Sequence, residues 1–218
     1  GDFSYRIEMG GSCGTLIPGY SSSSYYRPYT AKLNASTGNC LWAKMGQPRT
    51  SYNAYAEDVA IDNNGEISST GWFYNRVDFH GGSVYTYSYQ QSSNWDCFVV
   101  KYASNGAYLW AQAVGGSSTD YCYAIDMDGT TGNITIAGMY QSTAWFGNTY
   151  IASRGSTDAF YATLVPSSGG YVWDTIHHFG GSSSDYGWAV AVRNGTVAFG
   201  GYFYNSAYDD ANQLTLTG

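Results

Sequence analysis

Two carboxylates at alternate positions, Asp126 and Asp128, are followed directly by Gly129. Alternate carboxylates next to a glycine can wrap around a hard cation, so these residues resemble the start of a calcium loop. A complete loop would need more oxygen ligands and a glutamate further along the chain. The corresponding stretch in the preceding part of the chain is Asp62-Asn-Asn-Gly65, and Asp, Asn and Gly are favoured in hairpin turns. We therefore expect a turn here, with a calcium site at Asp126 and Asp128 as the alternative, and no other cofactor.

The three histidines give little support for catalysis. His177 and His178 are adjacent, and on a strand their side chains point to opposite faces and cannot easily share one ligand. His80 is isolated in the sequence. No G-x-S-x-G motif occurs, and no pair among the 16 acidic residues is marked out for glycoside cleavage. The expectation is that the protein is not an enzyme.

Three N-x-S/T sequons begin at Asn34, Asn133 and Asn194. Each lies at or beside an expected hairpin turn, where a glycan can project into solvent without disturbing a sheet. For an extracellular eukaryotic protein we expect glycans at these asparagines, whereas in a bacterial protein they would be uncommon.

Four cysteines fall into two pairs, Cys13 with Cys40 and Cys97 with Cys122, separated by 27 and 25 residues. They show no C-x-x-C spacing and have no histidine nearby, which argues against zinc. Two local disulfides formed in an oxidising compartment are expected, with four buried free thiols as the alternative. The protein is accordingly expected to be extracellular, either secreted or on the cell surface.

The composition is poor in charge and rich in tyrosine. Charged residues make up 11% of the chain and aromatic residues 18%, with 23 tyrosines and a net charge of −7. The nine basic residues do not cluster, so nucleic acid is not an expected partner. The apolar runs are too short for a membrane span. The chain begins at Gly1 without a Met or a signal-like segment, so we expect that an N-terminal piece has been removed or lies outside this sequence.

A repeat runs through the chain. Its first module is an apolar strand followed by a glycine and a tryptophan, and its copies lie at 29–42, 98–110 and 160–173. The tryptophans, Trp42, Trp110 and Trp173, recur at spacings of 68 and 63 residues. A second module, a hairpin that ends at a glycine, occurs at 57–71, 123–138 and 188–201, and residues 2–9 resemble 120–127 as a fourth copy. The repeat units are approximately 1–26, 27–93, 94–155 and 156–218.

Within each module apolar and polar residues alternate with period two, and Gly, Asn, Asp and Ser separate the runs, as in hairpins. No stretch of ten residues keeps a helical period. The sequence therefore predicts one all-β domain over residues 1–218, with about four antiparallel strands in each repeat of roughly 65 residues and about 3.5 to 4 repeats in total.

These motifs resemble the SBBP-type β-propeller repeat, whose units carry an Asp-Ala-Phe-x-x-x-Leu strand, a Gly and a Trp, and then a Gly-Gly turn. The third copy matches best, with Asp158-Ala-Phe160, Leu164, Trp173, Gly180-Gly181 and Asp185-Tyr186. The second keeps Asp96, Phe98, Trp110, Gly115-Gly116 and Asp120-Tyr121. The first departs from the pattern, with Arg27-Pro-Tyr29 and Gln47-Pro-Arg49. The resemblance implies a ring of four-stranded blades and no particular ligand or reaction.

Two functions are compatible with these features. The first is a structural or adhesive subunit that self-associates into a fibre, coat or matrix, because a charge-poor, tyrosine-rich surface favours lateral contact. The alternative is a carbohydrate-binding module in which Trp72, Trp95 or Trp145 stacks on sugar rings. The chain holds four copies of the hairpin module and three of the tryptophan module, so we expect one sheet to be left half complete. Either further repeats or a neighbouring subunit would supply its missing strands.

Overall fold

The computed structural model describes residues 1–17, 25–48, 52–85, 94–209 and 215–217. In these residues there is no α-helix, and a single 3₁₀ turn, η1 (Gly11–Cys13), is the only helical element. All the strands pair antiparallel and form several sheets. The prediction of an all-β protein is thus confirmed.

Two full sheets form the centre of the molecule. The first contains β7 (Ala54–Ile61), β8 (Ile67–Tyr74), β11 (Trp95–Tyr102) and β12 (Tyr108–Gly116), in that order. The second contains β13 (Tyr121–Met127), β14 (Ile134–Tyr140), β17 (Asp158–Ser167) and β18 (Gly170–Phe179), again in chain order. In each case a four-stranded sheet takes its first two strands from the hairpin module of one repeat and its last two from the tryptophan module of the next.

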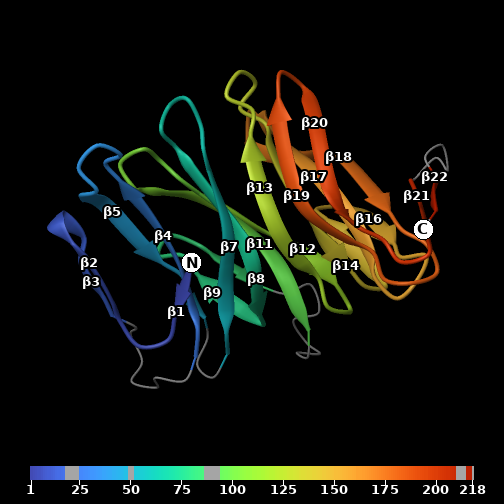
Figure 1. Ribbon diagram of the computed structural model, residues 1–218. Helices are drawn as coiled ribbons and strands as arrows, with labels where there is room; N and C mark the ends of the chain where they lie inside the picture. Colours follow the sequence, from blue (N-terminus) through green and yellow to red (C-terminus); the bar gives the residue numbers. More distant parts are fainter. Residues whose placement is uncertain (18–24, 49–51, 86–93, 210–214, 218) are drawn as a thin grey trace.

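Partial sheets lie at both ends of this row (Figure 1). The N-terminal sheet contains β1 (Asp2–Phe3), β4 (Arg27–Leu33) and β5 (Cys40–Met45), beside a small hairpin of β2 (Ile7–Gly10) and β3 (Gly14–Leu16). The open sheet at the other end contains β19 (Tyr186–Arg193) and β20 (Thr196–Tyr202). Figure 1 shows the sheets side by side in a curved row.

A short hairpin after the second strand of each sheet was not foreseen from the sequence. These hairpins are β9 (Arg76–Asp78) with β10 (Ser83–Tyr85), β15 (Thr143–Phe146) with β16 (Thr149–Ala152), and β21 (Ser206–Tyr208) with β22 (Thr215–Thr217). Each one pairs with the end of the fourth strand of the preceding sheet. β9 pairs with β6 (Gln47–Pro48), β15 pairs with Gly115 and Gly116, and Tyr208 bridges to Gly180. The repeated Gly-Gly motif is therefore a contact point between successive sheets.

A second set of repeated glycines, Gly71, Gly138 and Gly201, lies opposite a β-bulge in the first strand of each sheet. A Cβ atom at Gly138 would overlap the carbonyl oxygen of Tyr121, and Gly71 and Gly201 face Tyr55 and Tyr186 in the same way. These glycines are required by the close approach of two backbones and not by a positive φ.

The apolar faces of the sheets form two core clusters. One lies between the full sheets and includes Val99, Ile136, Phe146 and Phe160, and the other includes Phe73 and Phe98. The tryptophans of the repeat pack in or against these clusters: Trp42 belongs to the second and lies against Tyr102, and Trp110 and Trp173 lie against the first. The repeated aromatic residues thus hold sheet against sheet.

Candidate functional site

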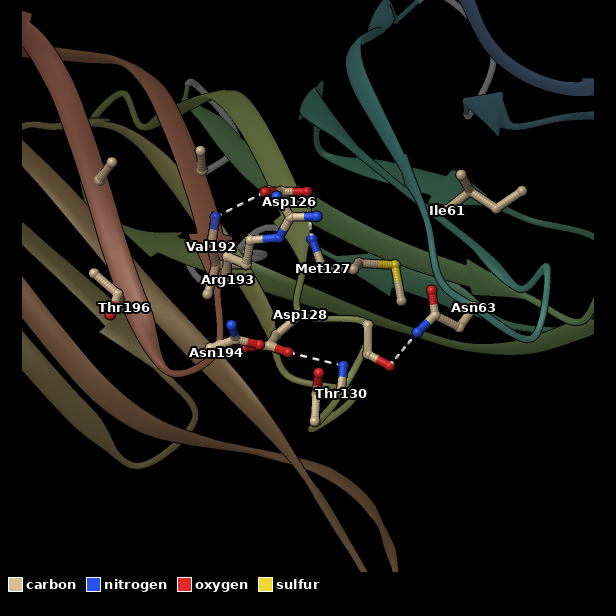
Figure 2. Close-up of a pocket in the computed structure, with 13 residues that line it drawn as sticks. Ile61, Asn63, Asp126, Met127, Asp128, Thr130, Val192, Arg193, Asn194 and Thr196 are labelled. Atoms are coloured by element: carbon tan, nitrogen blue, oxygen red, sulfur yellow. Dashed lines mark hydrogen bonds between the residues drawn. The ribbon is translucent and has the colours of Figure 1, made fainter.

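A groove of about 1000 Å³ lies where the first strands of three sheets end side by side (Figure 2). Its walls come from the end of β7, from β13 and the turn after it, and from the β19–β20 hairpin. The lining residues are Ile61, Asn63, Asp126, Met127, Asp128, Gly129, Thr130, Ala191, Val192, Arg193, Asn194, Thr196 and Ala198. The two carboxylates singled out in the sequence therefore both face this groove.

Asp126 joins two neighbouring sheets. Its Oδ2 accepts the backbone N–H of Val192 on β19 at 2.7 Å, and its Oδ1 accepts the N–H of Met127 at 2.8 Å. Asp58 on β7 does the same for the preceding pair of sheets, because its Oδ2 accepts the N–H of Ile125 on β13 at 2.9 Å. In both cases a carboxylate on the first strand of one sheet accepts a hydrogen bond from a backbone N–H on the first strand of the next sheet. Without the carboxylate that N–H would lack a partner.

Asp128 closes the turn that follows β13. Its Oδ1 accepts the N–H groups of Thr130 and Thr131, and its Oδ2 accepts the N–H of Gly195 at 2.9 Å. The hydrogen bond from Gly195 is the largest of the contributions that lower the pKa of this carboxyl below its usual value. Both oxygens of Asp126 and of Asp128 accept backbone hydrogen bonds, and those from Thr130 and Thr131 to Asp128 lie within the expected turn. No group of three or more potential metal ligands occurs among the residues that the structure describes.

Two of the histidines, His177 and His178, lie in different surroundings on β18. His178 Nδ1 is 2.7 Å from the hydroxyl of Tyr140, whereas the ring of His177 packs on Tyr161 with 5.0 Å between centroids. His80 is exposed and lies between β9 and β10 with φ of 56°.

Pairs of buried carboxylates recur at the junctions between sheets, and sequence reasoning did not identify them. In the second full sheet Asp158 is fully buried against Gly180, and the buried Asp185 comes shortly after Gly180 in the chain. Asp185 accepts the N–H of Gly181 at 2.9 Å through Oδ2 and that of Tyr204 at 3.1 Å through Oδ1. It therefore connects the end of β18 to the segment after β20.

The first full sheet repeats this arrangement with Asp96, packed against Gly115, and Asp120. Asp120 accepts the N–H of Gly116 at 2.8 Å and that of Gln141 at 3.3 Å. The signal was present in the sequence, since the Asp, Gly-Gly and Asp-Tyr motifs recur together, but only the fold brings them into contact. A side chain at Gly115 or Gly180 would collide with the carboxyl group of Asp96 or Asp158.

Burial raises the pKa of Asp158 to about 6, and the negative charge of Asp185 adds to the shift, while the N–H of Arg154 opposes it. Burial also raises the pKa of Asp120 well above its usual value, with Asp96 contributing in the same direction. At each junction one carboxyl therefore takes up a proton at a higher pH than it does in the unfolded chain.

A pH dependence of stability follows from Asp158. Its pKa is higher in the folded protein than in the unfolded chain, so its contribution is fully present below about pH 4 and is lost as the pH rises through about 6. We expect the free energy of unfolding of Asp158→Asn, measured by urea denaturation from pH 4 to 8, to fall less with rising pH than that of the wild type. Parallel curves for the two proteins would contradict this assignment.

Both predicted cysteine pairs are disulfides. Cys13 and Cys40 have a Cα–Cα distance of 5.8 Å, and Cys97 and Cys122 one of 5.3 Å. The second bond links β11 of the first full sheet to β13 of the second, and it lies within the core between them. No free cysteine remains in the described chain.

All three sequons lie at hairpin turns, as expected. Asn34 follows β4, and its Oδ1 accepts hydrogen bonds from the N–H and the hydroxyl of Ser36. Asn133 directly precedes β14, and Asn194 is an exposed residue of the β19–β20 turn.

The three candidate sugar-stacking tryptophans differ in exposure. Trp72 is covered by Tyr121, with 4.6 Å between ring centroids, and Trp95 packs edge-on against Tyr74. Trp145 is 37% exposed, and its ring lies 5.0 Å from that of Tyr150, which is 58% exposed. Of the three, Trp145 is therefore the one that projects into solvent.

No family model and no curated protein sequence matches the chain. No helix among the described residues is long and apolar enough to cross a bilayer.

Proposed function

We propose that this protein is an extracellular structural or adhesive subunit that self-associates, and that its sheets are blades of an SBBP-like β-propeller arrangement. The observation that carries the proposal is the repeated stacking of sheet on sheet. Trp72 of the first full sheet is covered by Tyr121 of the second, and Tyr123 of the second stacks on Trp188 of the open sheet at 4.0 Å. In the open sheet the aromatic side chains that a further sheet would cover are exposed, Trp188 to 47% and Tyr202 to 52%. An aromatic face of this kind favours contact with another protein surface.

The chemistry of the groove is consistent with this reading. The oxygens of Asp126 and Asp128 all accept backbone hydrogen bonds that hold sheets and turns together. A carboxylate used in this way is a poor general base, because proton uptake would break a structural contact. The groove residues are therefore assigned to the scaffold.

Self-association is tested by sedimentation velocity over a concentration series from about 1 to 100 μM, without any partner. We expect species larger than the monomer to increase with concentration, and Trp188→Ser with Tyr202→Ser to reduce them. The exposed pair Trp145→Ser with Tyr150→Ser is the matched control, since it removes equal aromatic surface elsewhere. A wild-type chain that stays monomeric over this range would refute the proposal.

Glycosylation gives a separate test of the extracellular assignment. When the protein is secreted from eukaryotic cells, we expect its intact mass to fall after glycosidase treatment, and the change to disappear when Asn34, Asn133 and Asn194 are all replaced by Gln. The single variants show which turn carries the glycan. An unchanged mass after glycosidase treatment of the wild type would count against the assignment.

A carbohydrate-binding module is the second candidate, and the exposed pair of Trp145 and Tyr150 favours it. Two neighbouring rings on a hairpin offer an apolar platform on which a sugar ring can stack. A glycan array followed by titration of tryptophan fluorescence tests this function. Saturable binding that is lost in Trp145→Ser would support it, and the absence of any bound glycan would contradict it.

A further inference from the structure

A lysine side chain is buried at one end of the first full sheet. Lys101 lies on β11, and its side chain is only 2% exposed. Its Nζ is 2.9 Å from Oε2 of Glu66 and 3.6 Å from Oδ2 of Asp62, whose side chain is 7% exposed. Both carboxyl groups belong to the turn that joins β7 to β8. An amine and two carboxyl groups therefore meet at a place that water reaches poorly.

The second full sheet folds without this lysine. Thr163 occupies the same position, since it lies opposite Thr135 as Lys101 lies opposite Ser68. Thr163 is buried, and its hydroxyl shares a hydrogen bond of 3.0 Å with that of Thr135. Burial of an ammonium group is costly even when the group is paired. The sheet does not require a lysine at this position, so Lys101 needs an explanation of its own.

The carboxyl group of Asp62 is oriented by its own turn. Its Oδ1 accepts the backbone N–H of Asn64 at 2.9 Å and that of Glu66 at 2.8 Å, whereas Oδ2 lies nearer to Lys101. Two backbone donors on one oxygen stabilise the negative oxygen of a tetrahedral intermediate in acyl transfer. If Nζ attacks Cγ of Asp62, the developing charge on Oδ1 is stabilised in this way, and Oδ2 is the oxygen that leaves.

The ammonium group of Lys101 is held in place from the next sheet as well. Nζ donates a hydrogen bond to the hydroxyl of Tyr171 at 2.9 Å, and that hydroxyl donates to the carbonyl oxygen of Gly132 at 3.1 Å. Burial lowers the pKa of Lys101, but its hydrogen bonds to Tyr171 and Glu66 outweigh burial and leave the pKa above its usual value. The amine is therefore charged at rest, and it becomes a nucleophile when a proton passes to Glu66.

We propose that Lys101 and Asp62 form an isopeptide bond once the chain has folded, and that Glu66 transfers the protons. Two protons of the ammonium group move in turn through Glu66 to Oδ2 of Asp62. The Nζ–Cγ bond forms, the Cγ–Oδ2 bond breaks, and one water molecule leaves. The positive charge of the ammonium group and the negative charge of the carboxylate are both lost, so no oxidant or further reactant is needed. The fold supplies the rate, because it holds the reacting groups in contact.

The bond joins β11 to the turn between β7 and β8 and closes a covalent loop over residues 62–101. A covalent crosslink restricts the unfolded chain and so favours the folded one. The bond braces the first full sheet from within one molecule. It does not depend on self-association, so a chain that proves to be monomeric leaves this proposal standing.

The mass of the denatured and reduced chain, produced without glycans, tests the bond, because an ion pair leaves the mass unchanged. We expect the wild type to be lighter than the mass calculated from its sequence by about 18 Da, the mass of one water molecule. Lys101→Arg keeps a positive charge beside Asp62, but a guanidinium group stays protonated and is not a nucleophile, so this variant is expected to show the full calculated mass. A wild type of full calculated mass would overturn the proposal.

Lys32→Arg is the matched control. Lys32 lies opposite Trp42 on β4 as Lys101 lies opposite Trp110, and it donates to the carbonyl oxygens of Gly65 and Ser104. We expect this variant to lose water as the wild type does. Full calculated mass in Lys32→Arg would contradict the assignment of the lost water to Lys101.

Peptide mapping locates the bond. We expect one branched peptide that contains both Asp62 and Lys101, and no cleavage by trypsin after Lys101. An aspartate that precedes a glycine can lose water by forming a cyclic imide, and Asp128-Gly129 is such a pair. Loss of water at Asp128 without a branched peptide would therefore overturn the proposal.

Glu66→Gln tests the proton transfer, because an amide cannot carry the protons from Nζ to Oδ2. We expect the full calculated mass for this variant, in a chain whose circular dichroism matches that of the wild type. If Glu66→Gln still lost water and gave the branched peptide, the role of Glu66 would be wrong.

Discussion

Gly138→Ala is expected to destabilise the protein by at least about 3 kcal/mol, since overpacking against fixed backbone is costly. An added Cβ would overlap the carbonyl oxygen of Tyr121 and approach the Cα of Cys122 at 3.0 Å. Neither atom can move freely, because β13 is bulged at this point and Cys122 is bonded to Cys97. Urea denaturation followed by tryptophan fluorescence measures the loss.

Gly169→Ala is the matched control for this substitution. No atom lies within 4 Å of a Cβ placed at Gly169, so we expect a change within about 0.5 kcal/mol, as for a surface site. If the two variants were equally stable, the close approach at Gly138 would not be a packing constraint.

Phe160→Ala is expected to lower the free energy of unfolding by about 3 to 5 kcal/mol. Phe160 is fully buried in the core between the full sheets, with the ring of Phe146 at 5.2 Å and that of Tyr140 at 6.3 Å. Its removal leaves a cavity that neighbours on three strands cannot fill. Chemical denaturation and the melting temperature measure the effect.

Tyr150→Ala is the control for Phe160→Ala, because it removes an aromatic ring that is 58% exposed. We expect little change in stability from it. A loss for Phe160→Ala as small as that for Tyr150→Ala would mean that Phe160 is not a core residue.

Much of the fold could be predicted from local patterns. The period-two alternation and the turn residues identify the hairpins, and the spacing of Trp42, Trp110 and Trp173 identifies the repeat. Both disulfides could be predicted because each joins modules that are neighbours in the chain. These features depend on residues near each other in sequence.

Features that depend on contacts between repeats could not be predicted. The hairpin of β15 and β16 has strands of only four residues, and it is stabilised by pairing with Gly115 and Gly116 about 30 residues earlier. The role of Asp126 was likewise hidden, since its partner Val192 lies 66 residues away. The paired carboxylates Asp158 and Asp185 become a pair only when β18 brings Gly180 and Gly181 between them.

The junction built by Asp120 with Gly116 and Gln141 is repeated by Asp185 with Gly181 and Tyr204, 65 residues further along the chain. Each junction uses residues of one sheet and of the sheet that follows it, and nothing from more distant parts of the molecule. An interval of the chain that was duplicated would therefore carry its own junction residues with it. Such a repeat could be added as a whole unit, because its contacts are made with the sheets next to it.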